Sequence, residues 1–288
     1  MQLAVANSTN SRLESKLLID LGRSPGTRFP ERCERNPTKV LNPGGVACSE
    51  ELPGTAPGLS YSSIEAVEVP DNNLSTAVEL HLSPERLQGY LAVCDGNLDR
   101  ALELYLWNST VSAAISESLG HLEIGVRNAL SRQLTLRHNN LGRIGTWLDD
   151  PADELTLRAR TDILDARSRV AGKGKPLTHP QIVSELSFGF WRYLISKRNL
   201  KLWPDLAGGF PNAPNRSLKT VEDPLIRLLD LRNRIAHHQR IWNLHLEARI
   251  RDLEDLLGYI DADFRDWVLL HSRVPSQLAA RPPHNRYR

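Results

Sequence analysis

The stretch NLDRALELYLWNSTVSAAISESLGHLEIGVRNALSRQL, residues Asn97 to Leu134, sets the fold class of this chain. Its apolar residues recur at spacings of three and four, the period of an α-helix with one buried face. The positions that carry the pattern are Ala101, Leu104, Tyr105, Leu119, Leu122, Val126 and Leu130. The pattern predicts either one long amphipathic helix or two helices that meet near Ser109 to Ser112. Gly120 and Gly125 are weak helix formers and indicate close helix–helix packing there.

Helical patterns continue on both sides of this stretch. Upstream, Ser83 is a favourable N-cap residue, Pro84 takes the first helical position, and Gly96 is a stop signal. Alternating strand patterns are nearly absent, and there are no internal repeats. The sequence therefore predicts an all-α fold, a bundle of about five to seven helices. Downstream helices are expected over residues 150–172, 178–198, 222–239 and 244–272, with a loop containing Pro204, Gly208, Gly209, Pro211 and Pro214 before the third.

The composition changes along the chain and divides it into three parts. Residues 1–75 are rich in Pro, Gly, Ser and Thr and lack periodicity, so we expect a disordered leader. Residues 76–272 carry the helical patterns and form the expected helical domain. Residues 273–288 contain four arginines and no acid, which predicts a flexible basic tail.

Charge and cysteine content exclude several classes of protein. The formal net charge is +2 over 288 residues, so an anionic partner must bind to a local basic patch. Cys33, Cys48 and Cys94 are widely spaced and odd in number, which argues against a disulfide framework, and Cys94 is expected to be a small buried residue. No stretch approaches the roughly 18 apolar residues of a membrane span. We therefore expect a cytoplasmic protein with no membrane partner.

A second stretch, LRNRIAHHQRIW from Leu231 to Trp242, concentrates cationic and proton-transfer side chains in an otherwise apolar segment. On a helix, Asn233 and His237 are four residues apart and share a face. Arg234 and His238 form a second such pair, rotated by about 100°. The spacing permits a shared site at this end of the helix.

Arg232 and His237 are the residues of this stretch that best fit RNA cleavage without a metal ion. They are five residues apart, about 140° around a helix, which a long arginine side chain can bridge. Histidine exchanges protons near neutral pH, and a guanidinium group matches a phosphate. A base that deprotonates the ribose 2′-hydroxyl lets that oxygen attack the neighbouring phosphate, while arginine stabilises the charge on phosphorus. A structural role stays open, because arginines and histidines near a helix end also satisfy free carbonyl groups.

The segment RNRIAHH resembles the R-N-x-x-A-H-H signature of the Abi-like (abortive infection) family, a branch of the HEPN superfamily of α-helical nucleases and RNA-binding domains. Residues Trp107–Leu130 and Glu185–Arg198 are similar to this family too, and the three blocks stand in the expected order across most of residues 83–270. The resemblance implies an HEPN-like helical bundle that dimerises. It also implies that the motif helices of two subunits form an RNA-cleaving cleft across a two-fold axis.

The resemblance assigns a role to each residue of the motif. Arg232 would be the phosphate-stabilising cation and His237 the proton-transfer residue. Asn233 would orient one of them. His238 would assist or act as an alternative base, since R-x5-H spacing also occurs in the superfamily.

Four residues complete the candidate site. Glu123 and Arg127 are four residues apart and predict an ion pair on a helix, which is either structural or supports the cleft. Arg192 lies between two aromatic residues, where it either contacts RNA or extends from an aromatic core. Arg234 is either a substrate contact or a solvated cation.

Two functions from different classes fit these observations. The first is a metal-independent RNA endonuclease in phage defence or as a toxin, a biological role that comes from the resemblance alone. The second is a catalytically inactive helical module that binds RNA or a partner protein. The intact Arg232, Asn233 and His237 set favours the enzyme, because a pure binding module has no need of a base beside the cation. We expect no metal and no cofactor; the expected partners are RNA, a second copy of the chain, and an antitoxin or phage-derived trigger.

Overall fold

The computed structural model describes residues 71–283, which lie within one compact unit of the chain. The predicted leader therefore lies outside the described residues except for its last five, which begin the first helix. The all-α prediction is confirmed, since the described residues contain eleven α-helices and no β-strand. The elements are α1 (Asp71–Leu82), α2 (Pro84–Leu91), α3 (Leu98–Asn140), α4 (Leu157–Gly172), α5 (His179–Glu185), α6 (Phe188–Leu194), α7 (Trp203–Leu206), α8 (Leu218–Ala236), α9 (Leu246–Ile260), α10 (Ala262–Leu270) and α11 (Val274–Ala279), with 3-10 helices η1 (Trp147–Asp149), η2 (Lys197–Leu202) and η3 (Ala207–Gly209).

The fold-deciding stretch forms one continuous helix, α3, of 43 residues. Of the two arrangements that the sequence left open, the break near Ser109 to Ser112 does not occur. The hydroxyl groups of Ser109 and Thr110 donate to carbonyls one turn earlier in the same helix, at 3.2 and 2.9 Å. These side chains thus bond within the helix and do not offer the backbone a non-helical alternative. At the start of α3, the Asn97 side chain accepts a hydrogen bond from the Arg100 backbone N–H at 2.9 Å and caps the helix.

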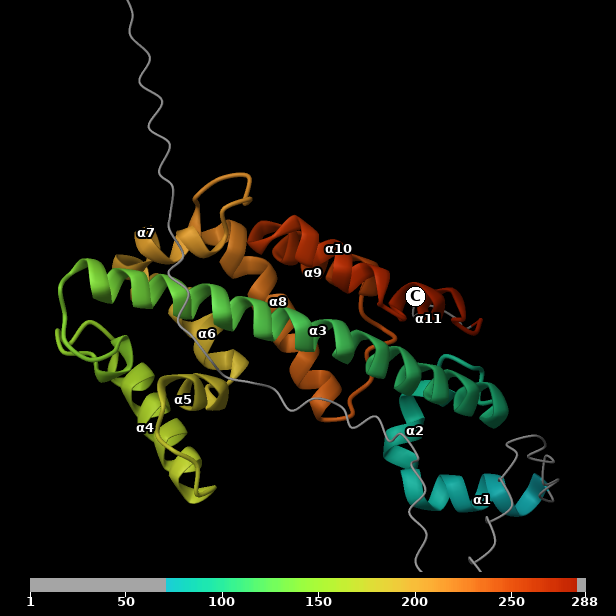
Figure 1. Ribbon diagram of the computed structural model, residues 1–288. Helices are drawn as coiled ribbons and strands as arrows, with labels where there is room; N and C mark the ends of the chain where they lie inside the picture. Colours follow the sequence, from blue (N-terminus) through green and yellow to red (C-terminus); the bar gives the residue numbers. More distant parts are fainter. Residues whose placement is uncertain (1–70, 284–288) are drawn as a thin grey trace, which may run out of the picture. The chain divides into compact units, whose positions relative to one another are not determined.

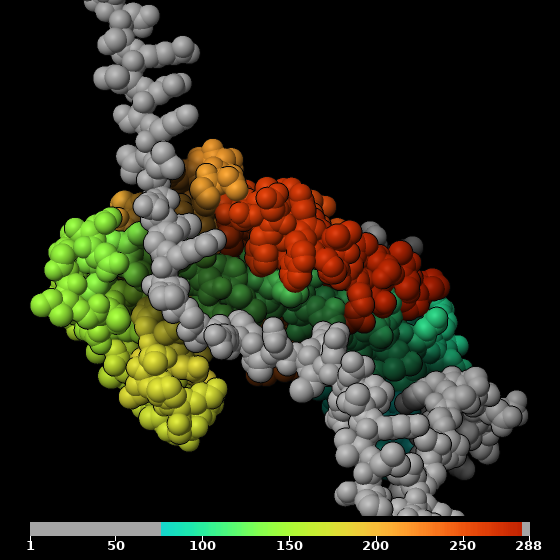
Figure 2. Space-filling model, viewed as in Figure 1, coloured from blue at the N-terminus to red at the C-terminus, as the bar shows by residue number. Residues whose placement is uncertain are grey.

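Helix α3 lies at the centre of the described unit. Figure 1 shows α8 crossing it and α9, α10 and α11 running along one side, and Figure 2 shows the side chains of these last helices against those of α3. Gly125 allows the close packing that we expected, since a Cβ atom there would lie 2.9 Å from Phe264 on α10. Gly120 has nothing within that reach, so its predicted role is wrong. Cys94 is fully buried, as expected.

Two helices expected to be continuous are each broken by a polar side chain. The expected helix 178–198 ends at Glu185, and Ser187 starts α6 by accepting a hydrogen bond from the Phe190 backbone N–H at 3.3 Å. The expected helix 244–272 is interrupted at Asp261, whose carboxylate accepts from the Phe264 backbone N–H at 2.8 Å. Apolar spacing alone misses such breaks, because an N-cap side chain can start a new helix without disturbing the period.

Other boundaries also differ from the predictions. The helix that carries the arginine–histidine motif, α8, begins at Leu218, and Pro224 lies inside it. The predicted proline- and glycine-rich loop contains η2, α7 and η3. Helix α4 starts at Leu157 behind the N-cap Thr156. The acidic residues before it do not start a helix, because Asp150 accepts backbone hydrogen bonds within the preceding turn instead.

The C-terminal segment packs against α3, where we had expected a flexible tail. The Trp107 indole N–H donates to the Gln277 carbonyl at 2.7 Å. The Arg273 guanidinium pairs with Glu117 at 2.6 Å. The tail prediction is therefore wrong for residues 273–283; residues 284–288 lie outside the described part. The segment's own composition, with arginines and no acid, predicts mobility, but Glu117 on α3 supplies an acid that pairs with Arg273.

A partly buried carboxylate network joins α3 to the loop that follows it, and it sets an acid limit on stability. Glu154 accepts hydrogen bonds from Arg143 and Arg137, each at 2.6 Å, and its side chain is 21% exposed. The hydrogen bond from Arg143, followed by that from Arg137, lowers the pKa of Glu154 from 4.5 to about 2. A depressed folded-state pKa stabilises the protein above the unfolded value, and this stabilisation is lost as the pH falls from 4.5 toward 2.

We expect Glu154→Gln to lower the free energy of unfolding by about 2 kcal/mol at pH 7 and to flatten its pH dependence below pH 5. Urea unfolding followed by circular dichroism between pH 7 and pH 3 measures both effects. Glu103→Gln is the matched control, because Glu103 is exposed and forms no ion pair within residues 71–283. An unchanged pH profile for Glu154→Gln would contradict the network's role.

Candidate functional site

The arginine–histidine motif lies at the C-terminal end of α8. The helix ends at Ala236, three residues before the expected Gln239, and His237 is its C-cap. His238 follows with a φ of 52°, in the left-handed region. The Gln239 backbone N–H donates to the Arg234 carbonyl at 2.8 Å, the long-range bond of a Schellman motif. Both histidine side chains are consequently displayed to solvent at a turn of defined geometry.

His238 occupies the position at which most Schellman motifs have glycine. A residue with a Cβ atom in the left-handed conformation costs about 1 kcal/mol. The Arg86 guanidinium on α2 donates to the His238 carbonyl oxygen at 2.6 Å and stabilises this conformation from outside α8. The long-range bond and the Arg86 contact together fix the backbone from which the two imidazole rings extend.

We expect His238→Gly to stabilise the protein by about 1 kcal/mol relative to His238→Ala, because glycine adopts a positive φ without strain. Urea unfolding of both variants measures the difference. An alanine variant as stable as the glycine variant would mean that the turn relaxes when the imidazole is removed. The same two variants also show whether RNA cleavage depends on the backbone conformation or on the imidazole of His238. Cleavage that is retained in His238→Gly but lost in His238→Ala would assign His238 a purely conformational role.

The segment after the histidines is fixed by a buried asparagine. The side-chain oxygen of Asn108 on α3 accepts hydrogen bonds from the backbone N–H groups of Ile241 and Trp242, at 2.8 and 3.1 Å. Asn108 is 5% exposed, so both bonds lie in the core. The Trp242 carbonyl in turn accepts from Arg281 at 2.6 Å. The turn is thus held by α2, α3 and the C-terminal segment.

The polar partner of Arg232 lies on α3. Its Nε–H donates to Glu123 at 3.0 Å, and its side chain is 43% exposed. The predicted pair of Glu123 with Arg127 does not form; Arg127 donates to Asn128 instead, at 3.3 Å. The terminal amino groups of Arg232 donate to no other group in the described part of the chain. Glu123 therefore binds only the Nε–H group of this guanidinium. The two terminal amino groups stay available as hydrogen-bond donors.

Within one chain, Arg232 and His237 face different directions. His237 still donates its backbone N–H to the Asn233 carbonyl at 3.0 Å, so helical geometry persists between them. Five residues of helix place the two side chains about 140° apart around the axis. Arg232 is also drawn toward α3 by Glu123. Asn233 is exposed and does not join the two side chains through a hydrogen bond.

A cationic groove of about 720 Å³ lies beside the histidine turn, between α2 and the end of α8. Arg86, Arg234 and Arg240 line it, and Arg234 is paired with Asp230 at 3.0 Å. The Arg240 side chain lies over Gly89 and leaves no room there for a Cβ atom. The candidate Arg234 therefore faces a groove that two further arginines share.

A second groove, of about 590 Å³, adjoins the first and is lined by His238, Gln239 and Arg86, with α3 opposite. Tyr105 lines this groove, and Tyr90 lines the cationic one. The two rings meet edge to face at 5.5 Å. Burial raises the pKa of Tyr90 to about 12, so its phenol stays neutral. The turn thus lies between two open grooves over a packed aromatic base.

Two predicted site residues lie away from this turn. Arg192 pairs with Glu222 at 3.8 Å, on the first half of α8. Ten residues of helix separate Glu222 from Arg232, about 15 Å along the axis. Arg127 lines a different groove, between α3 and α5. Neither side chain reaches the histidines.

Three residues at the turn were missed by sequence reasoning: Asn108, Arg86 and Arg240. Asn108 had a readable signal, because it follows Leu104 by four residues on the apolar face of α3, where a polar side chain needs a partner. The two arginines had none, since their roles depend on how α2 packs beside the end of α8.

The chain matches no family model, no curated protein and no solved structure. The resemblance to the Abi-like family therefore rests on the three sequence blocks quoted above. Within residues 71–283, no helix is both long and apolar enough to span a membrane.

Proposed function

We propose that this protein is an RNA endonuclease of the HEPN type that cleaves without a metal ion. The observation that carries the proposal is the exposed histidine pair on a turn whose backbone is fixed by three helices or segments. The stability of the fold does not depend on where a solvent-exposed imidazole lies. Catalysis does depend on it, because proton transfer requires a positioned acid or base.

The proposed reaction uses the side chains as follows. His237 takes the proton of a ribose 2′-hydroxyl, and the oxygen attacks the adjacent phosphorus. The terminal amino groups of Arg232 bind the phosphate oxygens as negative charge develops on them. A second imidazole returns a proton to the departing 5′ oxygen. The products are a 2′,3′-cyclic phosphate and a 5′-hydroxyl end.

The proposed site is completed by a second copy of the chain. One chain places Arg232 and His237 about 140° apart around the helix. The hydrogen bond from Arg232 to Glu123 draws the arginine toward α3 and keeps it from bridging that angle. Pairing of two α8 ends around a two-fold axis would bring His237 of one copy to Arg232 of the other. The imidazole that returns the proton would be that of His238, the assisting residue next to His237. This arrangement is the one that the family resemblance implies.

The proposal includes a cytoplasmic role in phage defence or as a toxin, restrained by an antitoxin or released by a phage-derived trigger. That part rests on the resemblance alone.

The test is cleavage of bulk RNA by the purified full-length chain in the presence of EDTA. We expect cleavage to persist, with 2′,3′-cyclic phosphate and 5′-hydroxyl ends identified by mass spectrometry and by end-labelling before and after phosphatase treatment. A requirement for a divalent metal, or 3′-hydroxyl and 5′-phosphate ends, would refute the mechanism. RNA binding without cleavage would favour the inactive binding module.

A further inference from the structure

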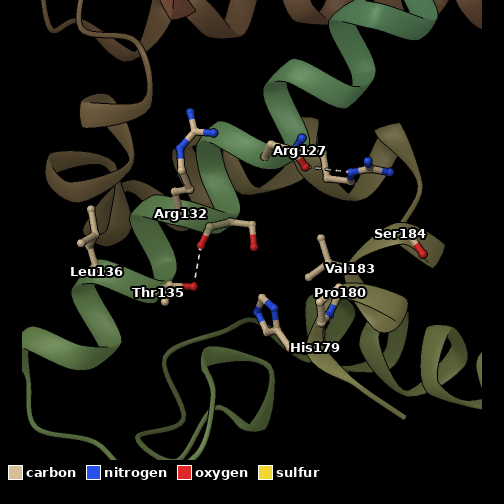
Figure 3. Close-up of a pocket in the computed structure, with 10 residues that line it drawn as sticks. Arg127, Arg132, Thr135, Leu136, His179, Pro180, Val183 and Ser184 are labelled. Atoms are coloured by element: carbon tan, nitrogen blue, oxygen red, sulfur yellow. Dashed lines mark hydrogen bonds between the residues drawn. The ribbon is translucent and has the colours of Figure 1, made fainter. Parts of the chain in front are cut away.

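A groove remote from the histidine turn has the features of a second RNA-binding subsite. It measures about 590 Å³ and lies between α3 and α5. In Figure 3, Arg127 and Arg132 extend from α3 in different directions at the border of the groove, Arg127 toward the side of Ser184, while His179, Pro180 and Val183 face α3 from α5. Its size is within the range of small-ligand sites. We call it the α3–α5 groove.

The charge of the α3–α5 groove is positive and uncompensated. No Asp or Glu lines it. Arg127 donates only to the neutral Asn128 side chain, and Arg132 forms no ion pair with any described carboxylate. Arg137, further along the same helix, is held by both Glu154 and Asp205. The two groove arginines therefore keep their hydrogen-bond donors available for an anion.

The wall of the groove combines aliphatic surface with one unsatisfied polar group. Leu136, Pro180 and Val183 supply aliphatic contacts. His179 has a buried Nε2 atom without a hydrogen-bond partner in the described chain. Burial lowers the pKa of His179, so its ring is neutral near pH 7 and has one donor and one acceptor nitrogen. His179 therefore adds to the groove wall a nitrogen that the described chain leaves without a partner.

We propose that the α3–α5 groove binds one nucleotide of a single RNA strand, with its base on the apolar wall and its flanking phosphates on Arg127 and Arg132. Two cations at separate positions along the groove suit two successive phosphates of a strand better than the one phosphate of a free mononucleotide. Proteins bind single strands with little sequence preference through a positively charged groove that also offers ring surfaces for the bases. The α3–α5 groove has the charge, an aliphatic wall and the His179 ring. The proposal deepens the proposed function and rests on it for the identity of the ligand.

Helix α3 connects this groove to the motif. Glu123, which holds Arg232, and the groove residues Arg127, Ser131 and Thr135 follow one another at spacings of four along α3. Residues at that spacing share a helix face, and each step advances about 6 Å. A strand whose scissile phosphate lies at Arg232 can thus continue along α3 into the groove.

The test measures binding of the full-length protein to a fluorescent 2′-O-methyl oligoribonucleotide, which lacks the attacking hydroxyl and is not cleaved. We expect the double variant Arg127→Gln with Arg132→Gln to bind about tenfold more weakly, with a log–log salt slope lower by about 1.4. The matched control is Lys219→Gln with Arg251→Gln, which removes the same charge from exposed positions on α8 and α9. The control should stay within about twofold of the parent, since distant surface charges are screened.

A third variant tests the base contact separately from the phosphates. His179→Leu should weaken strand binding by about three- to tenfold through one lost hydrogen bond, with the salt slope unchanged. Equal weakening by the two double variants, or no effect of the groove variant, would overturn the proposal. The proposal would also fail if the groove variant no longer bound adenosine or uridine 5′-monophosphate but still bound the strand as tightly as the parent.

The outcomes separate this subsite from the nuclease assignment. Groove-dependent strand binding by a protein that never cleaves RNA would refute the proposed function and leave the subsite in place. RNA cleavage by a protein whose strand binding does not depend on the groove would refute the subsite and leave the proposed function in place.

Discussion

Replacing His237 with alanine is expected to lower the rate of RNA cleavage by about 10²- to 10⁴-fold, the usual contribution of a positioned acid or base. His237 is exposed, and its imidazole forms no hydrogen bond with the described residues, so the variant should fold and bind RNA like the parent. Single-turnover cleavage and anisotropy with the 2′-O-methyl strand separate the two properties. His245→Ala is the matched control, because His245 is exposed eight residues further on and its side chain caps no helix. Equal activity of the two variants would exclude His237 as the proton-transfer residue.

Mixing variants shows whether the site is shared between two copies. If Arg232 of one chain acts with His237 of another, a dimer of an Arg232→Ala chain and a His237→Ala chain keeps one intact site. After denaturation, equal mixing and refolding, half of the dimers are mixed, so about a quarter of the parent activity should return. A site built within one chain would give no recovery.

Replacing Asn108 with alanine is expected to lower the free energy of unfolding by about 2–4 kcal/mol. The substitution removes the acceptor of two buried backbone N–H groups, and each unsatisfied group costs about 1–3 kcal/mol. The donors belong to Ile241 and Trp242, directly after the histidine turn. Cleavage should therefore fall together with stability, at temperatures where the variant is still folded. Urea unfolding and a cleavage assay of the same preparation measure the two effects.

Asn128→Ala is the control for this prediction, since Asn128 lies on the same helix but is exposed. Alanine favours a helix interior, so the control should be as stable as the parent or slightly more so. Equal stability of the two alanine variants would mean that water replaces the Asn108 oxygen and that the turn is not held from α3.

The apolar period from Asn97 to Leu134 was enough to predict a long central helix, because burial of one face is a local property of spacing. Ser83 and Pro84 likewise predicted the start of α2, since an N-cap acts on its own first turn. The same local reading joined α5 to α6 and α9 to α10, because Ser187 and Asp261 do not alter the apolar period that surrounds them.

The sequence by itself determined the helical class, the main amphipathic faces and the order of arginine, asparagine and histidine near the end of one helix. Only the tertiary structure decided that Glu123 holds Arg232 across 109 positions instead of its neighbour Arg127. It also decided that Arg86, Asn108 and Arg281 fix the turn. The physical reason is the separation along the sequence over which each feature acts. An apolar period or a helix cap is set within a few residues, whereas these hydrogen bonds form only after packing has brought distant helices together.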